Sequence, residues 1–163
     1  MDLSGFKTEE LLLAAIRSEI GANEAYIKLA GGVKNAFLKD RLEFLAGEEV
    51  KHKETLVQVF KEVFMGKEPV VPEETPVPLP DIVVPDEKVP LSEILQSAMN
   101  AEMAAHDFYT SLTERFDNPT RQATVTYLAA MEMGHYKLLE IEKQMAEDFE
   151  DYDEYWPMMH ADP

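Results

Sequence analysis

Two sequence motifs of the form Glu-x-x-His could bind metal ions. The first is Glu49 with His52 in "GEEVKHKE", and the second is Glu132 with His135 in "MEMGHYKL". Residues three apart lie on one face of a helix, so each motif presents a carboxylate and an imidazole side by side. This ligand pair suits iron or manganese, and the chain has no cysteine that could form a thiolate zinc site.

The two motifs belong to an internal repeat. Glu19 and Tyr26 precede the first motif, Glu102 and Tyr109 precede the second, and each residue lies 83 positions from its counterpart. A single Glu-x-x-His in an acidic helical protein is more often part of a solvated charged face. Here the pattern occurs twice at one offset, and its polar residues interrupt apolar stripes that would face a core. The repeat therefore indicates a buried polar site.

Four helices must position these residues. Apolar periodicity and helix-terminating residues predict a first helix that begins near residue 8 and is stopped by the Gly31-Gly32 pair, helices over about 35–65 and 92–116, and a fourth that begins at residue 119. Glycines follow the first two helices and a proline opens the fourth, as helix ends and starts prefer. The predicted N-cap residues are Thr8, Ser92 and Asn118.

A proline-rich segment, 67–90, separates the two helical pairs and holds seven of the chain's ten prolines. Such a segment runs extended, and 24 residues could span about 70 Å, whereas a helix of about 30 residues is roughly 45 Å long. The alternative is a flexible tether between two domains. We favour a crossover, because each helical pair has apolar stripes that only another pair could cover. The prediction is an all-α four-helix bundle of two helical hairpins over 1–148, with an acidic tail, 149–163, as an irregular or short helical appendage against the bundle end.

Buried carboxylates need compensation. Burying one unpaired charge costs several kcal/mol, so either the pKa values of these glutamates rise or cations neutralise them. Two ions could share bridging carboxylates among six protein ligands, an arrangement known in bundles that bind two iron or manganese ions. The six candidate ligands are Glu19, Glu49, His52, Glu102, Glu132 and His135.

At these residues the chain resembles the ferritin-like superfamily, and most closely its rubrerythrin branch. "EIGANEAY" (19–26) is similar to the first-helix signature of that family, and "EMAAHDFY" (102–109) repeats it; the resemblance covers roughly residues 8–146. It implies two iron ions, with manganese or a mixed pair as alternatives. It also implies roles for the ligands: Glu19 and His52 terminal on one ion, Glu102 and His135 terminal on the other, and Glu49 and Glu132 bridging both.

The same resemblance implies roles for Tyr26 and Tyr109, which would hydrogen-bond a carboxylate ligand and could donate an electron. The alternative is a pair of ordinary core tyrosines. Two departures from the family stand out. Rubrerythrins carry a four-cysteine iron site that this chain lacks, so electrons must come from a separate protein, and their extra third-helix glutamate is Ala105 here. His106, one turn after Glu102, could approach the site but is more often a packed or surface residue.

The resemblance further implies an oxidoreductase that reduces hydrogen peroxide or dioxygen at a non-haem di-iron centre, in defence against oxidative stress. A ferroxidase or iron-storage protein, or a metal-stabilised bundle without catalysis, are the alternatives. No haem is expected. Relatives of this kind are commonly dimers, so we expect a homodimer, in which the crossover could exchange hairpins between chains.

Composition limits the partners. The net charge of −17 opposes binding to nucleic acid or to an anionic membrane and favours attraction of cations. The N-terminus has no basic leader and no window approaches a membrane span, so we expect a cytoplasmic protein.

Overall fold

Four helices make up the fold, and no strand occurs among the residues described. The computed structural model describes residues 1–84 and 89–155, without the side chains of 149–155. The helices are α1 (Thr8–Gly32), α2 (Ala36–Val63), α3 (Leu91–Thr113) and α4 (Pro119–Tyr155). The all-α prediction is confirmed.

Two of the predicted helix caps are wrong. The N-cap of α1 is Lys7 rather than Thr8, and the Lys7 backbone N–H donates to the Glu10 carboxylate at 2.8 Å. The N-cap of α3 is Pro90 rather than Ser92, which is buried inside the first turn. In both cases the N-cap lies one or two residues before the side chain that seemed best suited to cap the helix.

The fourth helix is longer than predicted. The Asn118 side chain accepts hydrogen bonds from the backbone N–H groups of Thr120 and Arg121, as an N-cap should. From there α4 continues to Tyr155, so residues 149–155 extend the helix instead of forming a separate appendage. The rest of the predicted tail, 156–163, lies outside the described residues.

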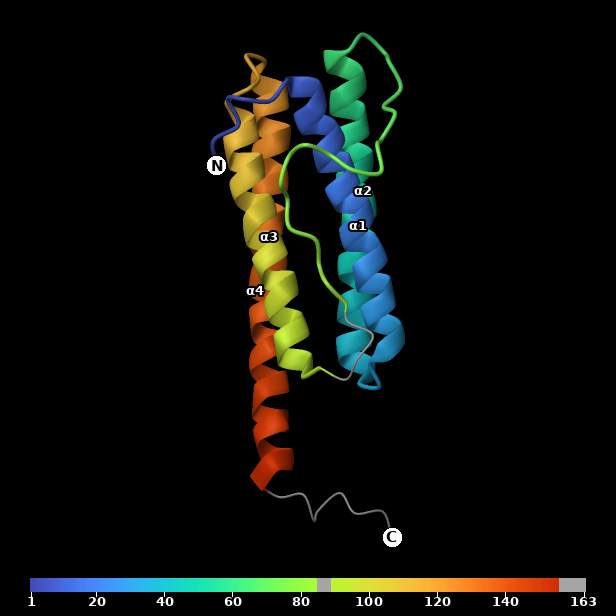
Figure 1. Cartoon of the computed structure of the whole chain (residues 1–163), viewed down its shortest axis with the longest axis vertical. Helices are drawn as coiled ribbons and strands as arrows, with labels where there is room; N and C mark the ends of the chain where they lie inside the picture. Colours follow the sequence, from blue (N-terminus) through green and yellow to red (C-terminus); the bar gives the residue numbers. More distant parts are fainter. Residues whose placement is uncertain (85–88, 156–163) are drawn as a thin grey trace.

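The helices form two antiparallel hairpins that stand side by side (Figure 1). α1 packs along α2, α3 packs along α4, and α2 also contacts α4. The proline-rich segment runs along the bundle from the end of α2 back toward the start of α3, as a crossover must. It is tied to α1 by Arg17 Nε, which donates to the Glu73 carbonyl at 3.3 Å, and by Lys28 Nζ, which donates to the Val84 carbonyl at 3.0 Å.

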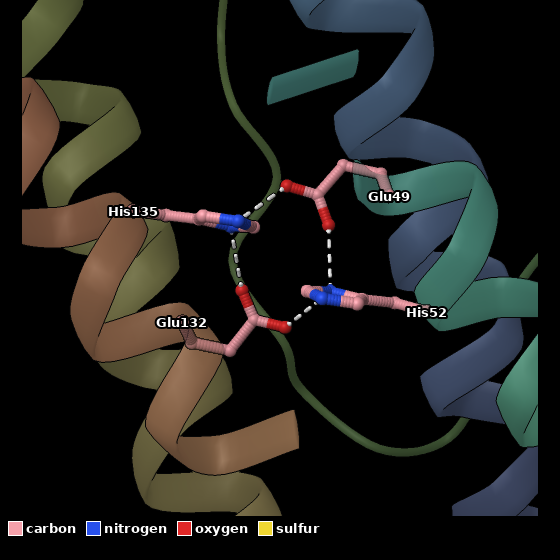
Figure 2. Close-up of side chains that lie close together, drawn as sticks. All are labelled: Glu49, His52, Glu132 and His135. Atoms are coloured by element: carbon pink, nitrogen blue, oxygen red, sulfur yellow. Dashed lines mark ion pairs between the residues drawn. The ribbon is translucent and has the colours of Figure 1, made fainter. Parts of the chain in front are cut away.

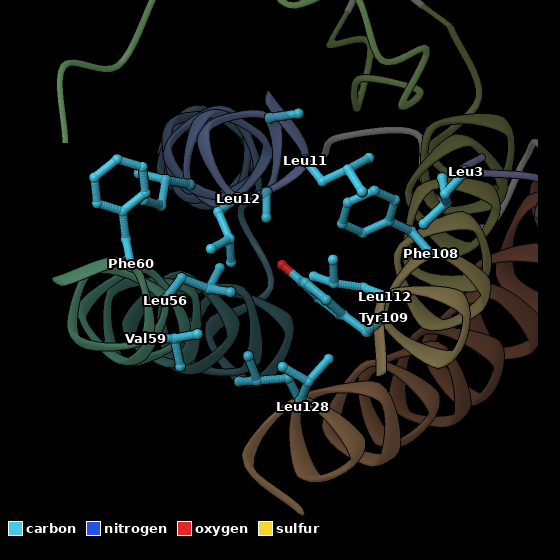
Figure 3. Close-up of a cluster of buried hydrophobic side chains, with 14 of the residues drawn as sticks. Leu3, Leu11, Leu12, Leu56, Val59, Phe60, Phe108, Tyr109, Leu112 and Leu128 are labelled. Atoms are coloured by element: carbon cyan, nitrogen blue, oxygen red, sulfur yellow. The ribbon is translucent and has the colours of Figure 1, made fainter. Parts of the chain in front are cut away.

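Buried apolar side chains gather in two clusters. The first cluster draws on all four helices and includes Leu12, Phe60, Phe108 and Leu128 (Figure 3). The second cluster also draws on all four helices; its members include Leu29, Leu42, Leu95 and Leu139. The six candidate ligands belong to neither cluster, and their sequence positions place them between the two. A polar layer thus separates two dry cores.

A buried ion pair joins the hairpins away from that layer. The Glu142 carboxylate of α4 is buried and lies 2.5 Å from Nε of Arg41 on α2, whose side chain is half exposed. Glu142 continues the apolar stripe of α4, yet it has its own cationic partner. It is therefore a structural acid.

No described helix combines the length and apolarity needed to cross a lipid bilayer.

Gly47 gives a test of how backbone entropy affects the stability of α2. It is exposed in the middle of α2, and a Cβ added there would meet nothing within 4 Å. Gly47→Ala should raise the free energy of unfolding by roughly 0.5–1 kcal/mol, because alanine loses less backbone entropy in a helix. Chemical denaturation would measure it. Gly66 is the matched control: its φ of +86° disfavours any side chain, so Gly66→Ala should be destabilising.

Candidate metal centre

Four buried side chains converge where the hairpins meet. Glu49 and His52 project from α2, and Glu132 and His135 project from α4, with one potential ligand atom of each within 4.8 Å of the others. Figure 2 shows that they alternate around a ring, each imidazole lying between the two carboxylates. Each Glu-x-x-His motif has turned both its side chains to the same point, as its helical spacing predicts.

The distances around this ring are short. His52 Nδ1 lies 2.9 Å from Glu132 Oε1 and 3.1 Å from Glu49 Oε2. His135 Nδ1 lies 3.2 Å from one carboxylate oxygen of Glu49 and 3.2 Å from one of Glu132. Each glutamate thus offers one oxygen to each histidine. A carboxylate placed in this way can bridge two ions.

The two remaining glutamates flank the ring. Glu19 Oε2 of α1 lies 3.8 Å from His52 Nδ1, and Glu102 Oε2 of α3 lies 3.5 Å from His135 Nδ1. Each flanking glutamate is therefore nearest the histidine of its own half of the chain. This arrangement suits the pairing in which Glu19 and His52 serve one ion while Glu102 and His135 serve the other.

The tyrosines connect the two halves. Tyr26 donates its hydroxyl hydrogen to Glu102 Oε1, and Tyr109 donates to Glu19 Oε1. Each tyrosine lies seven residues, or about 10.5 Å, along its helix from the glutamate of its own half. It reaches the glutamate of the other half instead. Both tyrosines are fully buried, and their predicted contact with a carboxylate is present.

Polar atoms at the ring lack hydrogen-bond partners. All six candidate ligands are between 1% and 3% exposed. Both oxygens of Glu49, one oxygen of Glu132 and both ring nitrogens of each histidine are buried without a hydrogen bond. Leaving a buried polar group unsatisfied costs about 1–3 kcal/mol. Groups that point together but do not bond to each other are those that a metal ion would satisfy.

The charge states without metal differ between the two glutamate pairs. Burial would raise the pKa of Glu49 and Glu132, but the His135 and His52 imidazoles outweigh it, lowering the pKa of Glu49 and bringing that of Glu132 to about 2. Burial alone would lower the pKa of both histidines, and the surrounding carboxylates instead raise each to about 12. Two carboxylates and two imidazolium ions then balance.

The flanking groups are held neutral. Burial raises the pKa of Glu19 well above its usual value, and the Glu132 carboxylate raises it further. Burial likewise raises the pKa of Glu102 well above normal, although the His135 imidazole acts in the opposite direction. Burial also raises the pKa of Tyr26 and of Tyr109, so both phenols keep their protons and donate them.

This donor set fits two divalent ions. Two ions could take the place of two protons from the histidines and two from the flanking glutamates, leaving four carboxylates against four positive charges. The interior would remain neutral before and after the exchange, so loading adds no uncompensated buried charge. The two imidazole rings, stacked with centroids 5.2 Å apart, would repel each other if both stayed protonated.

Other candidate residues lie elsewhere. His106 Nδ1 is 2.7 Å from the Ala129 carbonyl, and His106 is not one of the four clustered ligands. Sequence reasoning predicted the crossover but not its contribution to the site: Pro80, Asp81 and Ile82 line a cavity of about 20 Å³ together with candidate ligands. Only the length of the proline-rich segment hinted that it would pass the site.

Comparison with known structures places the fold. KatB, a manganese catalase from Anabaena, superposes with a TM-score of 0.66 at 20% identity, covering 81% of this chain and 68% of that one. A hypothetical protein from Pyrococcus furiosus superposes with a TM-score of 0.81 at 35% identity, covering 91% of this chain and 95% of that one. No curated protein sequence gives a significant match. The chain is a ferritin-like bundle.

The family follows from the sequence match. The model of the rubrerythrin family matches residues 10–143. This range includes all six candidate metal ligands. The chain belongs to the rubrerythrin family. The resemblance drawn from the two Glu-x-x-His motifs is confirmed at the level of the family and of the fold.

The bridging assignment can be tested by metal analysis. Glu49→Ala and Glu132→Ala should each lose both ions, because each removed carboxylate contacts both halves of the ring. Glu19→Ala should retain more metal than either. Glu142→Ala is the control, since it removes another buried acid of α4, which has its own partner, Arg41. Two ions per chain in Glu49→Ala or Glu132→Ala would contradict the assignment.

Metal binding should release protons. At pH 6, loading two divalent ions should release about four protons per chain, because the pKa values of the histidines and of the flanking glutamates are raised while those of the bridging glutamates are lowered. Apparent affinity should therefore rise with pH. Calorimetry in buffers of different ionisation enthalpy would count the protons; release of fewer than two would contradict these charge states.

Proposed function

We propose that the protein is a non-haem di-iron oxidoreductase that reduces hydrogen peroxide or dioxygen. The observation that carries this proposal is the ring of two Glu-x-x-His pairs, buried and without hydrogen-bond partners, at the junction of two hairpins. Family membership supports the same class of chemistry. The ligand types favour iron or manganese over zinc.

The residues of the ring would hold the ions. Glu49 and Glu132 would be shared by both ions, and each histidine would bind one of them. Two ferrous ions there would supply two electrons together, the number needed to reduce one peroxide to two waters with two protons. The apolar clusters on either side exclude bulk water from the layer. Bridging carboxylates can change their binding mode, which accommodates a change in charge at the ions without movement of the helices.

The tyrosines would act as positioning residues. Tyr26 and Tyr109 each hold one oxygen of a flanking glutamate and leave its other oxygen directed at a histidine. A hydrogen bond of this kind fixes the orientation of a ligand and tunes its basicity. Because each tyrosine comes from the other half of the chain, it also makes each ion position depend on both hairpins.

Electron supply and assembly complete the proposal. The chain has no cysteine, so it carries no cysteine-ligated electron-transfer site and would receive electrons from a separate protein. We propose that it acts as a cytoplasmic homodimer. Exchange of a hairpin between two chains would reproduce the same ring, since either hairpin supplies half of it.

Single-turnover kinetics would test the activity. Protein loaded with two ferrous ions without oxygen should consume one hydrogen peroxide per centre, with an absorption change as the iron oxidises. Tyr26→Phe should slow this step about tenfold, because Glu102 loses the hydrogen bond that positions it. Tyr127→Phe, which changes an exposed tyrosine of α4, should react at the wild-type rate.

Other outcomes would favour the alternatives. Uptake of iron far beyond two ions per chain would indicate a ferroxidase that feeds a store. Release of dioxygen from peroxide by manganese-loaded protein would indicate the activity named for the Anabaena relative. A protein that binds two ions but reacts with neither peroxide nor dioxygen would contradict the proposed oxidoreductase and leave a metal-stabilised bundle.

A further inference from the structure

The crossover covers one side of the metal centre. Val77 is buried in the first apolar cluster, and Ile82 packs against the second. The segment between them therefore bridges the polar layer from one dry core to the other. Figure 2 shows the backbone of the crossover passing behind the four ring residues. Asp81 lies within this bridging segment and is exposed.

The small cavity beside the centre is lined by pairs of residues that correspond in the repeat. Its walls include Ser18 and its repeat counterpart Ala101, and Ala22 and its counterpart Ala105. The two flanking and the two bridging glutamates complete the paired walls. Only the crossover residues have no counterpart. Because the lining includes a flanking and a bridging glutamate from each half of the repeat, one entrance could serve both halves of the centre.

A larger pocket adjoins the cavity on its outer side. It has a volume of about 320 Å³, and Ser18 and Asp81 line both hollows. Its other walls include the acidic residues Glu73 and Glu74 of the crossover. Arg17 also lines this pocket, so its three carboxylates face one guanidinium and outnumber it. The two hollows thus share the residues Ser18 and Asp81, which lie between this outer pocket and the buried carboxylates.

The Asp81 side chain is turned toward α1. A Cβ built on Gly21 would lie 3.8 Å from Asp81 Oδ1, which places this carboxylate against the helix that carries Ser18 and Glu19. On the inner side, both Glu49 oxygens are buried without hydrogen-bond partners and line the cavity. A cation held by Asp81 would next meet these free oxygens.

We propose that Asp81 and Ser18 form the entrance through which divalent cations reach the centre, with Asp81 as the first ligand that an incoming ion meets. This inference rests on the proposed metal centre. Oxygen ligands suit the hard, hydrated ions Fe²⁺ and Mn²⁺, and an acidic mouth raises their local concentration. The surrounding charge of −17 acts in the same direction but over the whole surface, whereas Asp81 acts at one place.

The test is the rate of metal entry. Metal-free protein is mixed with Co²⁺, and the visible absorption of bound cobalt is followed by stopped flow, with the final stoichiometry measured by dialysis. Asp81→Asn keeps the shape of the side chain and should slow loading at least fivefold at low ionic strength. Asp81→Lys should slow it further. Both variants should reach the same two ions per chain as the wild type.

The control is Glu54→Gln, which removes one charge from an exposed acid of α2 that lines a separate surface hollow. It should load at the wild-type rate, which separates a local entrance from a general loss of negative charge. Wild-type loading rates in Asp81→Asn and Asp81→Lys would overturn the entrance while leaving the centre intact. Failure of the wild type to bind two Co²⁺ at equilibrium would overturn the metal centre itself, and the entrance with it.

Discussion

The fold depends on charge compensation inside a dry interior. Four glutamates and two histidines occupy positions where a helical bundle would otherwise place leucines, with an apolar cluster on each side. Without metal, the raised pKa values of the flanking glutamates and of the histidines favour a neutral layer; with two divalent ions, four carboxylates would balance the charge of the metal. Both states avoid an unpaired buried charge, which would cost several kcal/mol. The helices can therefore fold first and load afterwards.

Sequence reasoning reached the ligand set because helical spacing is simple geometry. Glu49 and His52 must share a face of α2, and the repeat of that motif in α4 made a shared centre the economical interpretation. The family followed from the same residues. Helix starts were less predictable: Ser92 has the side chain of an N-cap, but the N-cap of α3 is Pro90 and Ser92 is buried in the first turn.

The pairing of each tyrosine with a glutamate of the other hairpin could not be predicted. The repeat shows that Tyr26 follows Glu19 by seven residues, but only the docking of the hairpins decides that its hydroxyl meets Glu102. The same limit applies to Asp81, since periodicity says nothing about where an extended proline-rich segment lies. Local patterns specify which face of a helix is turned inward. Long-range placement needs the three-dimensional structure.

The reciprocal tyrosine contacts have a consequence for how the centre is built. Neither hairpin owns a complete ion position, because each terminal carboxylate is fixed by a phenol from the opposite hairpin. Bound metal would thus add a further link between the two hairpins, beside the two apolar clusters and the Arg41–Glu142 ion pair that already join them, and its removal would weaken their docking more than it would affect either hairpin alone. The extent of metal binding and the strength with which the two hairpins dock would therefore be thermodynamically linked.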